Sequence, residues 1–110
     1  MVLTRDFKET IQARVRRDPA FRAELLKEAI ECMLSGDLDT GKTVLRDYIN
    51  STIGFKALGA ATHKSPKSLM RMFGPKGNPQ ARNLFEVIGY LRKQEAVRFE
   101  LRSSPIARIE

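Results

Sequence analysis

Three pairs of neighbouring residues, each a helix-capping residue followed by proline, constrain the fold of this chain more than any other feature of its sequence. The pairs are Asp18 with Pro19, Ser65 with Pro66, and Asn78 with Pro79. Side chains of Asp, Ser and Asn accept hydrogen bonds from the free amides of a first helical turn, and proline suits the first helical position because no N–H is needed there. Each pair therefore predicts the start of a helix.

Apolar residues recur every three or four positions in the first half of the chain, which is the spacing of amphipathic helices. The first expected helix has Thr4 as its cap and carries the apolar residues Phe7, Ile11 and Val15. A second helix begins at Pro19, and Gly36 is placed to end it in a left-handed conformation. After a polar connection at residues 37–40, a third helix carries Val44, Leu45, Tyr48 and Ile49 and ends near Asn50 or Ser51.

Residues 53–95 are expected to hold three further short helices. The first covers residues 55–61, a turn follows at 62–65, and the second covers residues 66–73. Residues 74–79, with the sequence GPKGNP, are rich in turn-forming residues. The last helix then begins with Asn78 as its cap, and its buried face consists of Leu84, Val87, Ile88 and Leu91.

From residue 97 the apolar period becomes that of a half-buried strand, in which every second side chain faces the same way. Val97, Phe99 and Leu101 alternate with Arg98, Glu100 and Arg102. A lone strand leaves its backbone unpaired, so we expect it to pair with an edge elsewhere in the chain or in a second chain.

The expected fold is all-α: one compact domain with a helical bundle, an N-terminal helical extension and a short C-terminal strand. Its parts are N-terminal helices at residues 1–52, a helical region at 53–95, and a strand with a tail at 96–110. The N-terminal helices are expected to serve as a packing surface for a dimer or another partner.

Composition bounds the class of protein. No apolar run approaches the roughly 20 residues that span a bilayer, and the first residues lack the apolar region of a signal peptide. We therefore expect a cytoplasmic protein without a membrane partner. Cys32 is the single cysteine, which excludes an intrachain disulfide and a cysteine-based metal site. It stands among apolar residues at helical spacing, so we expect it to be buried.

The net charge of +7 comes from the middle of the chain. Residues 1–50 hold nine basic and nine acidic residues, and residues 99–110 hold two of each. No acidic residue lies between Asp47 and Glu86. The basic residues in that gap are Lys56, Lys64, Lys67, Arg71, Lys76 and Arg82. A field of one sign attracts a polyanion, although a solvated basic surface without a partner has the same composition.

The basic segment coincides with a two-helix pattern at residues 55–73. Two helices that cross closely need small residues at the crossing, which Gly59, Ala60 and Ala61 supply. The turn between them needs a left-handed residue, and histidine, here His63, is among the non-glycine residues enriched in that conformation. The residues of the second helix that are expected to face inward are Leu69, Met72 and Phe73.

The other side chains of the second helix are expected to face solvent, as in a helix that enters the major groove of double-stranded DNA. That groove admits one helix, whose N-terminal side chains reach base edges while neighbouring cations contact phosphates. The residues expected to read bases are Ser65, Pro66, Lys67, Ser68, Met70 and Arg71. The residues expected to contact phosphates are Lys56, Lys64, Lys76, Asn78 and Arg82; Asn78 also marks an expected helix N-terminus, whose amides attract anions.

At these residues the chain resembles lambda-repressor-like (Xre-type) helix-turn-helix proteins, and more closely the addiction-module antidote family of type II antitoxins. The resemblance lies in DPAFRAELLKEAIECMLSGD (residues 18–37), VLRDYI (44–49), ALGAAT (57–62), SPKSLMRMFGPKGNP (65–79) and NLFEVIGYL (83–91). It implies a transcriptional regulator that forms a homodimer, binds its own promoter and neutralises a small ribonuclease toxin. His63 stands where these proteins usually have glycine, and Lys64 where an apolar residue is common.

The sequence predicts no catalytic residue, no metal ligand and no cofactor, so we expect a protein that is not an enzyme. His63 is the only histidine, and a turn residue explains it better than a general base does, because no carboxylate lies nearby in the sequence.

Two alternatives to the recognition of double-stranded DNA remain. A protein-binding module would use the strand at residues 97–101 to capture a toxin or another partner, with DNA binding incidental. RNA binding would need exposed aromatic rings on which bases stack; Phe55, Phe73 and Tyr90 are instead expected to be buried.

Overall fold

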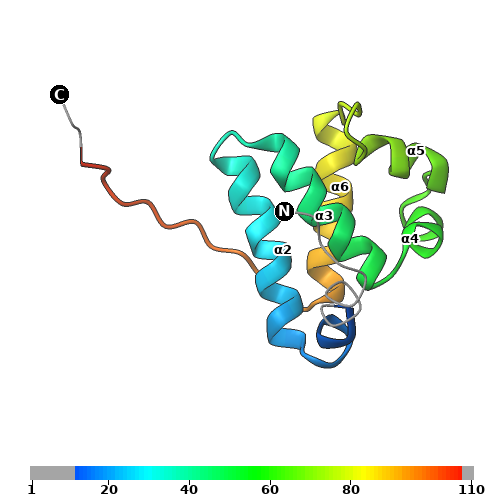
Figure 1. Ribbon diagram of the computed structural model, residues 1–110, viewed down its shortest axis with the longest axis horizontal. Helices are drawn as coiled ribbons and strands as arrows, with labels where there is room; N and C mark the ends of the chain where they lie inside the picture. Colours follow the sequence, from blue (N-terminus) through cyan, green and yellow to red (C-terminus); the bar gives the residue numbers. More distant parts are fainter. Residues whose placement is uncertain (1–11, 108–110) are drawn as a thin grey trace.

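The computed structural model describes residues 12–107, which form a bundle of helices followed by an extended C-terminal tail (Figure 1). The helices are α2 (Pro19–Leu34), α3 (Leu38–Ser51), α4 (Phe55–Thr62), α5 (Pro66–Met72) and α6 (Ala81–Gln94), and residues 12–17 are helical as well. The α2 and α3 helices pack side by side, α4 and α5 lie on the opposite side of the bundle, and α6 runs between the two pairs (Figure 1). The all-α class is confirmed for these residues. The expected cap Thr4 and the apolar Phe7 and Ile11 lie outside them.

Two of the three predicted helix starts are confirmed. At the start of α2 the amide of Phe21 donates to Asp18 Oδ1 at 3.2 Å. At the start of α5 the amide of Ser68 donates to Ser65 Oγ at 3.0 Å. Gly36 follows α2 with φ of +92°, so the prediction of a left-handed residue at the end of this helix is also confirmed.

Two helix starts differ from the prediction. The α3 helix begins at Leu38, inside the expected polar connection, because Asp37 caps it by accepting a hydrogen bond from the amide of Thr40 at 3.2 Å. The α6 helix begins at Ala81, and the predicted cap Asn78 lies in the preceding loop. Gln80 is the N-cap residue of α6 and makes no side-chain cap hydrogen bond.

One hydrophobic core joins the helices, with contributions from α2 through α6. Its buried members are Leu26, Ala29, Leu45, Tyr48, Ile49, Phe55, Leu58, Leu69, Phe73, Leu84, Val87 and Leu91. Met72, Ile88 and Tyr90 pack against its edge as partly buried side chains. Cys32 is only partly buried, and Leu34 is 62% exposed, so the last turn of α2 is less covered than its apolar spacing indicated.

A polar network joins three of the helices through the side chain of Glu95. The Tyr48 hydroxyl of α3 donates to Glu95 Oε1 at 2.5 Å, and Arg22 Nε of α2 donates to the same carboxylate oxygen at 3.0 Å. Arg22 also donates to the carbonyl oxygen of Val15 at 3.0 Å. Burial, and secondly the hydrogen bond to Glu95, raise the pKa of Tyr48 well above its usual range. The network therefore connects residues 12–17, α2, α3 and the end of α6.

The predicted strand at residues 97–101 is not formed in the single chain, and residues 12–107 contain no other strand. Ala96, with φ of +54°, turns the chain at the end of α6, and the amide of Val97 donates to the Arg92 carbonyl oxygen at 3.3 Å. The tail then passes α2 and leaves the bundle (Figure 1). Because no second extended segment lies beside it, the tail has no edge with which to form a ladder.

None of the helices within residues 12–107 combines the length and the apolar character that a membrane crossing requires.

Replacing Tyr48 with Phe is expected to lower the free energy of unfolding by about 1 kcal/mol at neutral pH, because the hydrogen bond to Glu95 is lost. The unfolded chain releases the tyrosine proton near pH 10, whereas the raised pKa of Tyr48 keeps the proton on the folded protein. The stability that this proton contributes is therefore present below about pH 10 and is lost as the pH rises further. Urea denaturation at neutral and alkaline pH should show the difference between wild type and Tyr48→Phe shrinking above about pH 10. Parallel pH profiles would contradict this.

Candidate nucleic-acid interface

The α4 and α5 helices are joined by a sharp three-residue turn. His63 has φ of 57° and ψ of 41°, so the predicted left-handed turn residue is confirmed. A Cβ atom on Gly59 would lie 2.5 Å from the Lys64 carbonyl oxygen, so only glycine allows this close approach. Ala60 and Ala61 are exposed and take no part in it, which corrects the expectation that all three small residues serve the crossing.

The inner face of α5 is anchored in the core. Leu69 is fully buried, and the ring of Phe73 is buried at a centroid distance of 6.3 Å from the ring of Phe55 on α4. Met72 is partly buried at the edge. The helix lies at the periphery of the bundle, away from α2 (Figure 1). This attachment decides which side of α5 faces solvent.

The outer face of α5 carries the side chains predicted to read bases. Lys67, Ser68, Met70 and Arg71 are all exposed. Lys67 and Arg71 are four residues apart, so they lie on the same side of the helix. This face therefore offers two cationic hydrogen-bond donors, one hydroxyl group and the apolar side chain of Met70, which is 55% exposed.

The two residues at the start of α5 differ in what they offer. The Ser65 hydroxyl accepts from the amide of Ser68 and donates to Ser68 Oγ at 2.8 Å, so it is engaged in capping the helix. The Ser68 hydroxyl accepts that bond and keeps its own hydrogen to donate. Pro66 is exposed at the first helical position and offers only an apolar surface.

Four of the five residues predicted to contact phosphate are exposed, and they lie in three different segments. Lys56 lies in the first turn of α4, Lys76 and Asn78 in the loop after α5, and Arg82 in the first turn of α6. The first turn of α6 also has no side-chain cap. The helix N-terminus expected at Asn78 thus lies at Gln80, two residues further along the chain.

Lys64 differs from the other predicted cations. Its Nζ atom donates to Glu86 Oε2 on α6 at 2.6 Å, and its side chain is 17% exposed. The hydrogen bond from Lys64 lowers the pKa of Glu86. The acid-free segment of the sequence therefore receives an acidic partner in the folded protein, and Lys64 links the turn between α4 and α5 to α6.

Lys42 holds the loop after α5, a role that no pattern in the sequence indicates. Lys42 is 3% exposed, and its Nζ atom donates to the carbonyl oxygens of Gly74 at 3.0 Å and Gly77 at 2.7 Å. A Cβ atom on Gly77 would collide with the backbone of Arg71 and Met72, so the loop packs directly on the last turn of α5. The 32 and 35 residues between Lys42 and these carbonyls explain why local spacing could not reveal the contact.

The surface contains ammonium and guanidinium groups, hydroxyl and amide groups and the exposed apolar side chains of Pro66 and Met70. Within residues 12–107 no group of three His, Cys, Asp or Glu side chains is arranged to hold a metal ion. The surface is suited to contact an anionic partner through hydrogen bonds and charge.

Replacing Lys42 with Met is expected to lower the free energy of unfolding by about 2–3 kcal/mol, because two charge-assisted hydrogen bonds are lost from a buried site. Lys93→Met is the matched control: Lys93 is exposed, and the same change there should cost less than about 0.5 kcal/mol. Chemical denaturation monitored by circular dichroism measures both variants. Equal decreases in the free energy of unfolding for the two variants would show that the hydrogen bonds from Lys42 to the loop do not stabilise the protein.

Comparison of the chain with models of protein families, with curated proteins and with solved structures found no match. The strongest arrangement is the exposed cationic face of α5, whose opposite face is buried in the core.

Proposed function

We propose that this chain is a sequence-specific regulator that binds double-stranded DNA through a lambda-repressor-like helix-turn-helix formed by α4, the turn at His63 and α5. In this proposal α5 enters the major groove and residues 53–95 are the DNA-binding region. The observation that carries the proposal is the exposure of Lys67 and Arg71 on one side of a helix whose other side is anchored in the core.

The residues of α5 divide into direct base contacts and helix positioning. Arg71 and Lys67 donate to guanine O6 and N7, the usual acceptors for basic side chains in the major groove. Ser68 donates to a base or a phosphate, and Met70 and Pro66 contact thymine methyl groups. Ser65 serves mainly by capping α5, since its hydroxyl is already engaged with Ser68.

The flanking residues contact the sugar–phosphate backbone. Lys56, Lys76 and Arg82 supply cations, Asn78 supplies an amide, and the uncapped first turn of α6 directs backbone amides at a phosphate. Lys64 is left out of this set because it is paired with Glu86.

We further propose that the protein is the antitoxin of a toxin–antitoxin module and represses its own promoter as a cytoplasmic homodimer. This part rests on the resemblance at residues 18–37, 44–49, 57–62, 65–79 and 83–91, and on the tail, whose exposed Leu101 and Ile106 suit a protein partner.

The alternative function is a protein-binding module whose partner is a toxin and for which DNA is incidental. The exposed apolar residues of the tail favour it. Substituting both Lys67 and Arg71 with Gln distinguishes the two. Under the leading proposal this double variant no longer represses a promoter reporter. Under the alternative it still captures its protein partner, and only substitutions in the tail weaken that capture.

An electrophoretic mobility shift with the duplex upstream of the protein's own coding sequence tests the leading proposal. Arg71→Gln or Lys67→Gln is expected to reduce the preference for that duplex over an unrelated one by about 10- to 100-fold, because a bidentate base contact contributes roughly 1–3 kcal/mol of discrimination. Lys76→Gln should weaken binding to both duplexes alike. Lys93→Gln, which changes the charge equally at the far end of α6, is the control. Absence of binding to either duplex at low salt would refute the proposal.

Salt dependence provides a second test. Three exposed phosphate-contacting cations per protomer amount to about six contacts for a dimer on two half-sites, so affinity should fall by roughly three decades between 50 and 200 mM salt. Fluorescence anisotropy of a labelled duplex measures the slope of log affinity against log salt. A slope near zero would contradict a surface that contacts phosphates.

A further inference from the structure

The C-terminal tail has the sequence of a strand and an unpaired backbone. Its apolar residues Val97, Phe99 and Leu101 alternate with charged ones, yet beyond Val97 no backbone hydrogen bond joins the described part of the tail to the rest of the chain. Leu101 is 82% exposed and Ile106 is 89% exposed. An extended apolar segment with free N–H and C=O groups is a template for pairing with another strand.

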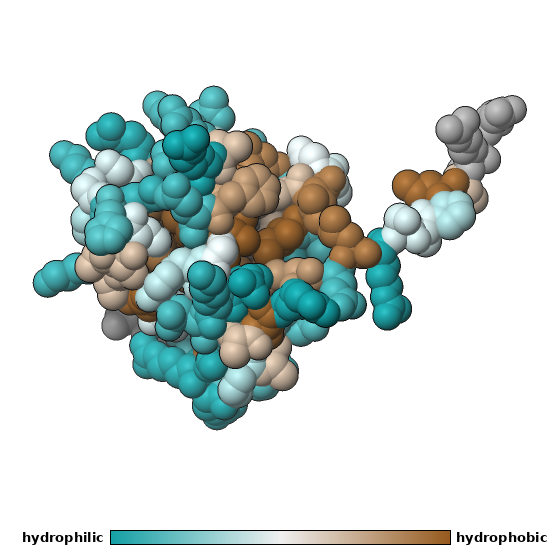
Figure 2. Space-filling view, turned by 180° about the vertical axis from the view of Figure 1, so that it is seen from behind, coloured by the Kyte–Doolittle hydropathy of each residue, from teal (hydrophilic) through white to brown (hydrophobic). Residues whose placement is uncertain are grey.

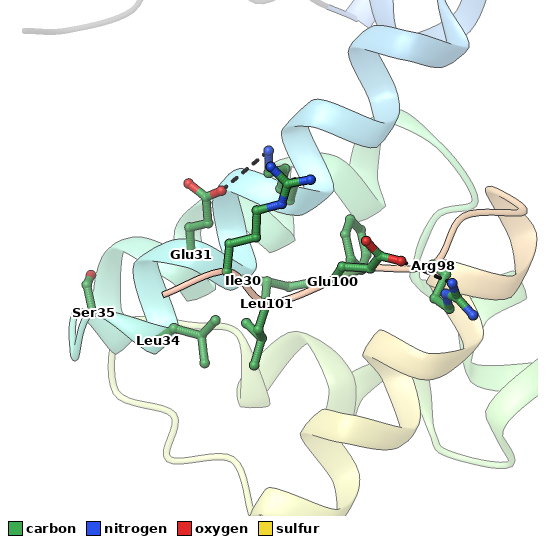
Figure 3. Close-up of a pocket in the computed structure, with 10 residues that line it drawn as sticks. Ile30, Glu31, Leu34, Ser35, Arg98, Glu100 and Leu101 are labelled. Atoms are coloured by element: carbon green, nitrogen blue, oxygen red, sulfur yellow. Dashed lines mark hydrogen bonds and ion pairs between the residues drawn. The ribbon is translucent and has the colours of Figure 1, made fainter. Parts of the chain in front are cut away.

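A partly apolar groove separates the tail from the last turns of α2. Ile30 and Leu34 of α2 line it on one side, and Phe99 and Leu101 of the tail line it on the other. The side chains of Leu34 and Leu101 point into the same gap, while Glu100 and Arg98 lie together away from it (Figure 3). The molecule seen from behind has a hydrophobic surface that reaches the point where the tail leaves the bundle (Figure 2).

We propose that residues 97–101 pair with the same residues of a second copy as an antiparallel two-stranded ribbon with its two-fold axis at Phe99. The apolar face of the ribbon covers the groove beside α2 in both copies. This inference assigns the surface that makes the homodimer, and it does not depend on DNA binding.

Charge selects the register of the ribbon. Directly opposite residues of an antiparallel pair share one face, so the axis must pass through a residue, and the candidates are Phe99, Glu100 and Leu101. An axis at Glu100 places this carboxylate opposite its own copy and Arg98 opposite Arg102. Like charges directly opposite each other destabilise a sheet, which excludes this register.

An axis at Phe99 places opposite charges against each other on one face of the ribbon and apolar side chains against each other on the other face. Arg98 lies opposite Glu100 of the second copy in two symmetric pairs, Val97 lies opposite Leu101, and Phe99 lies opposite itself. Both charged side chains are exposed, with 81% of Arg98 and 65% of Glu100 accessible, and within one chain they pair with each other at 3.0 Å. In the ribbon this exposed pair is exchanged for two symmetric pairs between the copies. An axis at Leu101 also pairs opposite charges but places Phe99 opposite Ser103, which loses an apolar pair.

The backbone of Val97 agrees with the same register. Its amide donates to the Arg92 carbonyl oxygen, and its carbonyl oxygen accepts from the Arg92 guanidinium at 2.9 Å. Val97 therefore has no backbone group left for a ladder. Hydrogen-bonded and non-hydrogen-bonded pairs alternate along an antiparallel ribbon, so with Phe99 in a non-hydrogen-bonded pair Val97 is in one too. The ladder bonds then come from Arg98 and Glu100.

Size-exclusion chromatography with light scattering on the full chain, without DNA, tests the proposal. The wild-type protein is expected to be a dimer. Arg98→Glu places carboxylates opposite each other at two sites and should raise the dimer dissociation constant at least about tenfold, which corresponds to roughly 1.4 kcal/mol. Glu100→Arg should do the same, and the double variant Arg98→Glu/Glu100→Arg should restore dimerisation, because the pairs are then re-formed with reversed charge.

Arg102→Glu is the matched control for register. In the proposed ribbon Arg102 faces Ala96 of the second copy, so this variant should leave the dissociation constant unchanged. Loss of the dimer in Arg102→Glu, with Arg98→Glu unaffected, would instead place the axis at Leu101 and overturn the register. A wild-type monomer at high protein concentration, or a dimer insensitive to Arg98→Glu and Glu100→Arg, would overturn the interface.

Unchanged thermal unfolding of the four variants would show that each substitution acts on association alone. Since no DNA is present, failure of the ribbon leaves the proposed DNA binding untouched. Failure of DNA binding likewise leaves the ribbon standing.

Discussion

A helix of seven residues has little stability of its own in water, because the few hydrogen bonds it makes do not offset the cost of starting it. The α5 helix is of this length, and its existence depends on the burial of Leu69 and Phe73 in the common core. The Lys42 ammonium group holds the loop that packs on its last turn. The same interactions that form α5 therefore also decide its orientation, with Lys67 and Arg71 toward solvent. Stability and the candidate binding surface have a single physical origin here.

Two carboxylates from the C-terminal half of the chain, Glu86 and Glu95, are each paired with a cation in the folded protein. Glu95, although late in the sequence, is drawn into contact with Arg22 and Tyr48, so its charge is neutralised inside the bundle. Glu86 is balanced by Lys64. With these two carboxylates paired, the exposed cations on and around α5 meet little opposing charge from the C-terminal half. A positive field at the outer face of α5 is the physical basis of the proposed contact with a polyanion.

The end of α6 links the bundle to the tail. Ala96 adopts a left-handed conformation that reverses the chain, and Val97 uses its amide on the Arg92 carbonyl oxygen. Residues 98–102 are extended, alternate charged and apolar side chains, and have no second strand beside them within residues 12–107. In the proposed ribbon a second copy supplies that strand with complementary charge. The proposed ribbon and the proposed mode of DNA recognition stand on separate observations.

The sequence alone was sufficient for features that depend on neighbouring residues. The caps at Asp18 and Ser65, the left-handed turn at His63 and the buried face of α6 could all be predicted, because capping, backbone sterics and helical periodicity act over three or four residues. The start of α6 was placed two residues early, because an Asn before a proline is a capping signal, whereas Gln80 is the N-cap residue in the structure. Only the tertiary structure decided the pairing of Lys64 with Glu86, the hydrogen bonds from Lys42 to the loop and the Tyr48–Glu95–Arg22 network. It also decided that no second strand lies beside the tail within residues 12–107. Those features join residues that are far apart in the chain, and only the packing of the helices brings their charges and hydrogen-bonding groups within reach of each other.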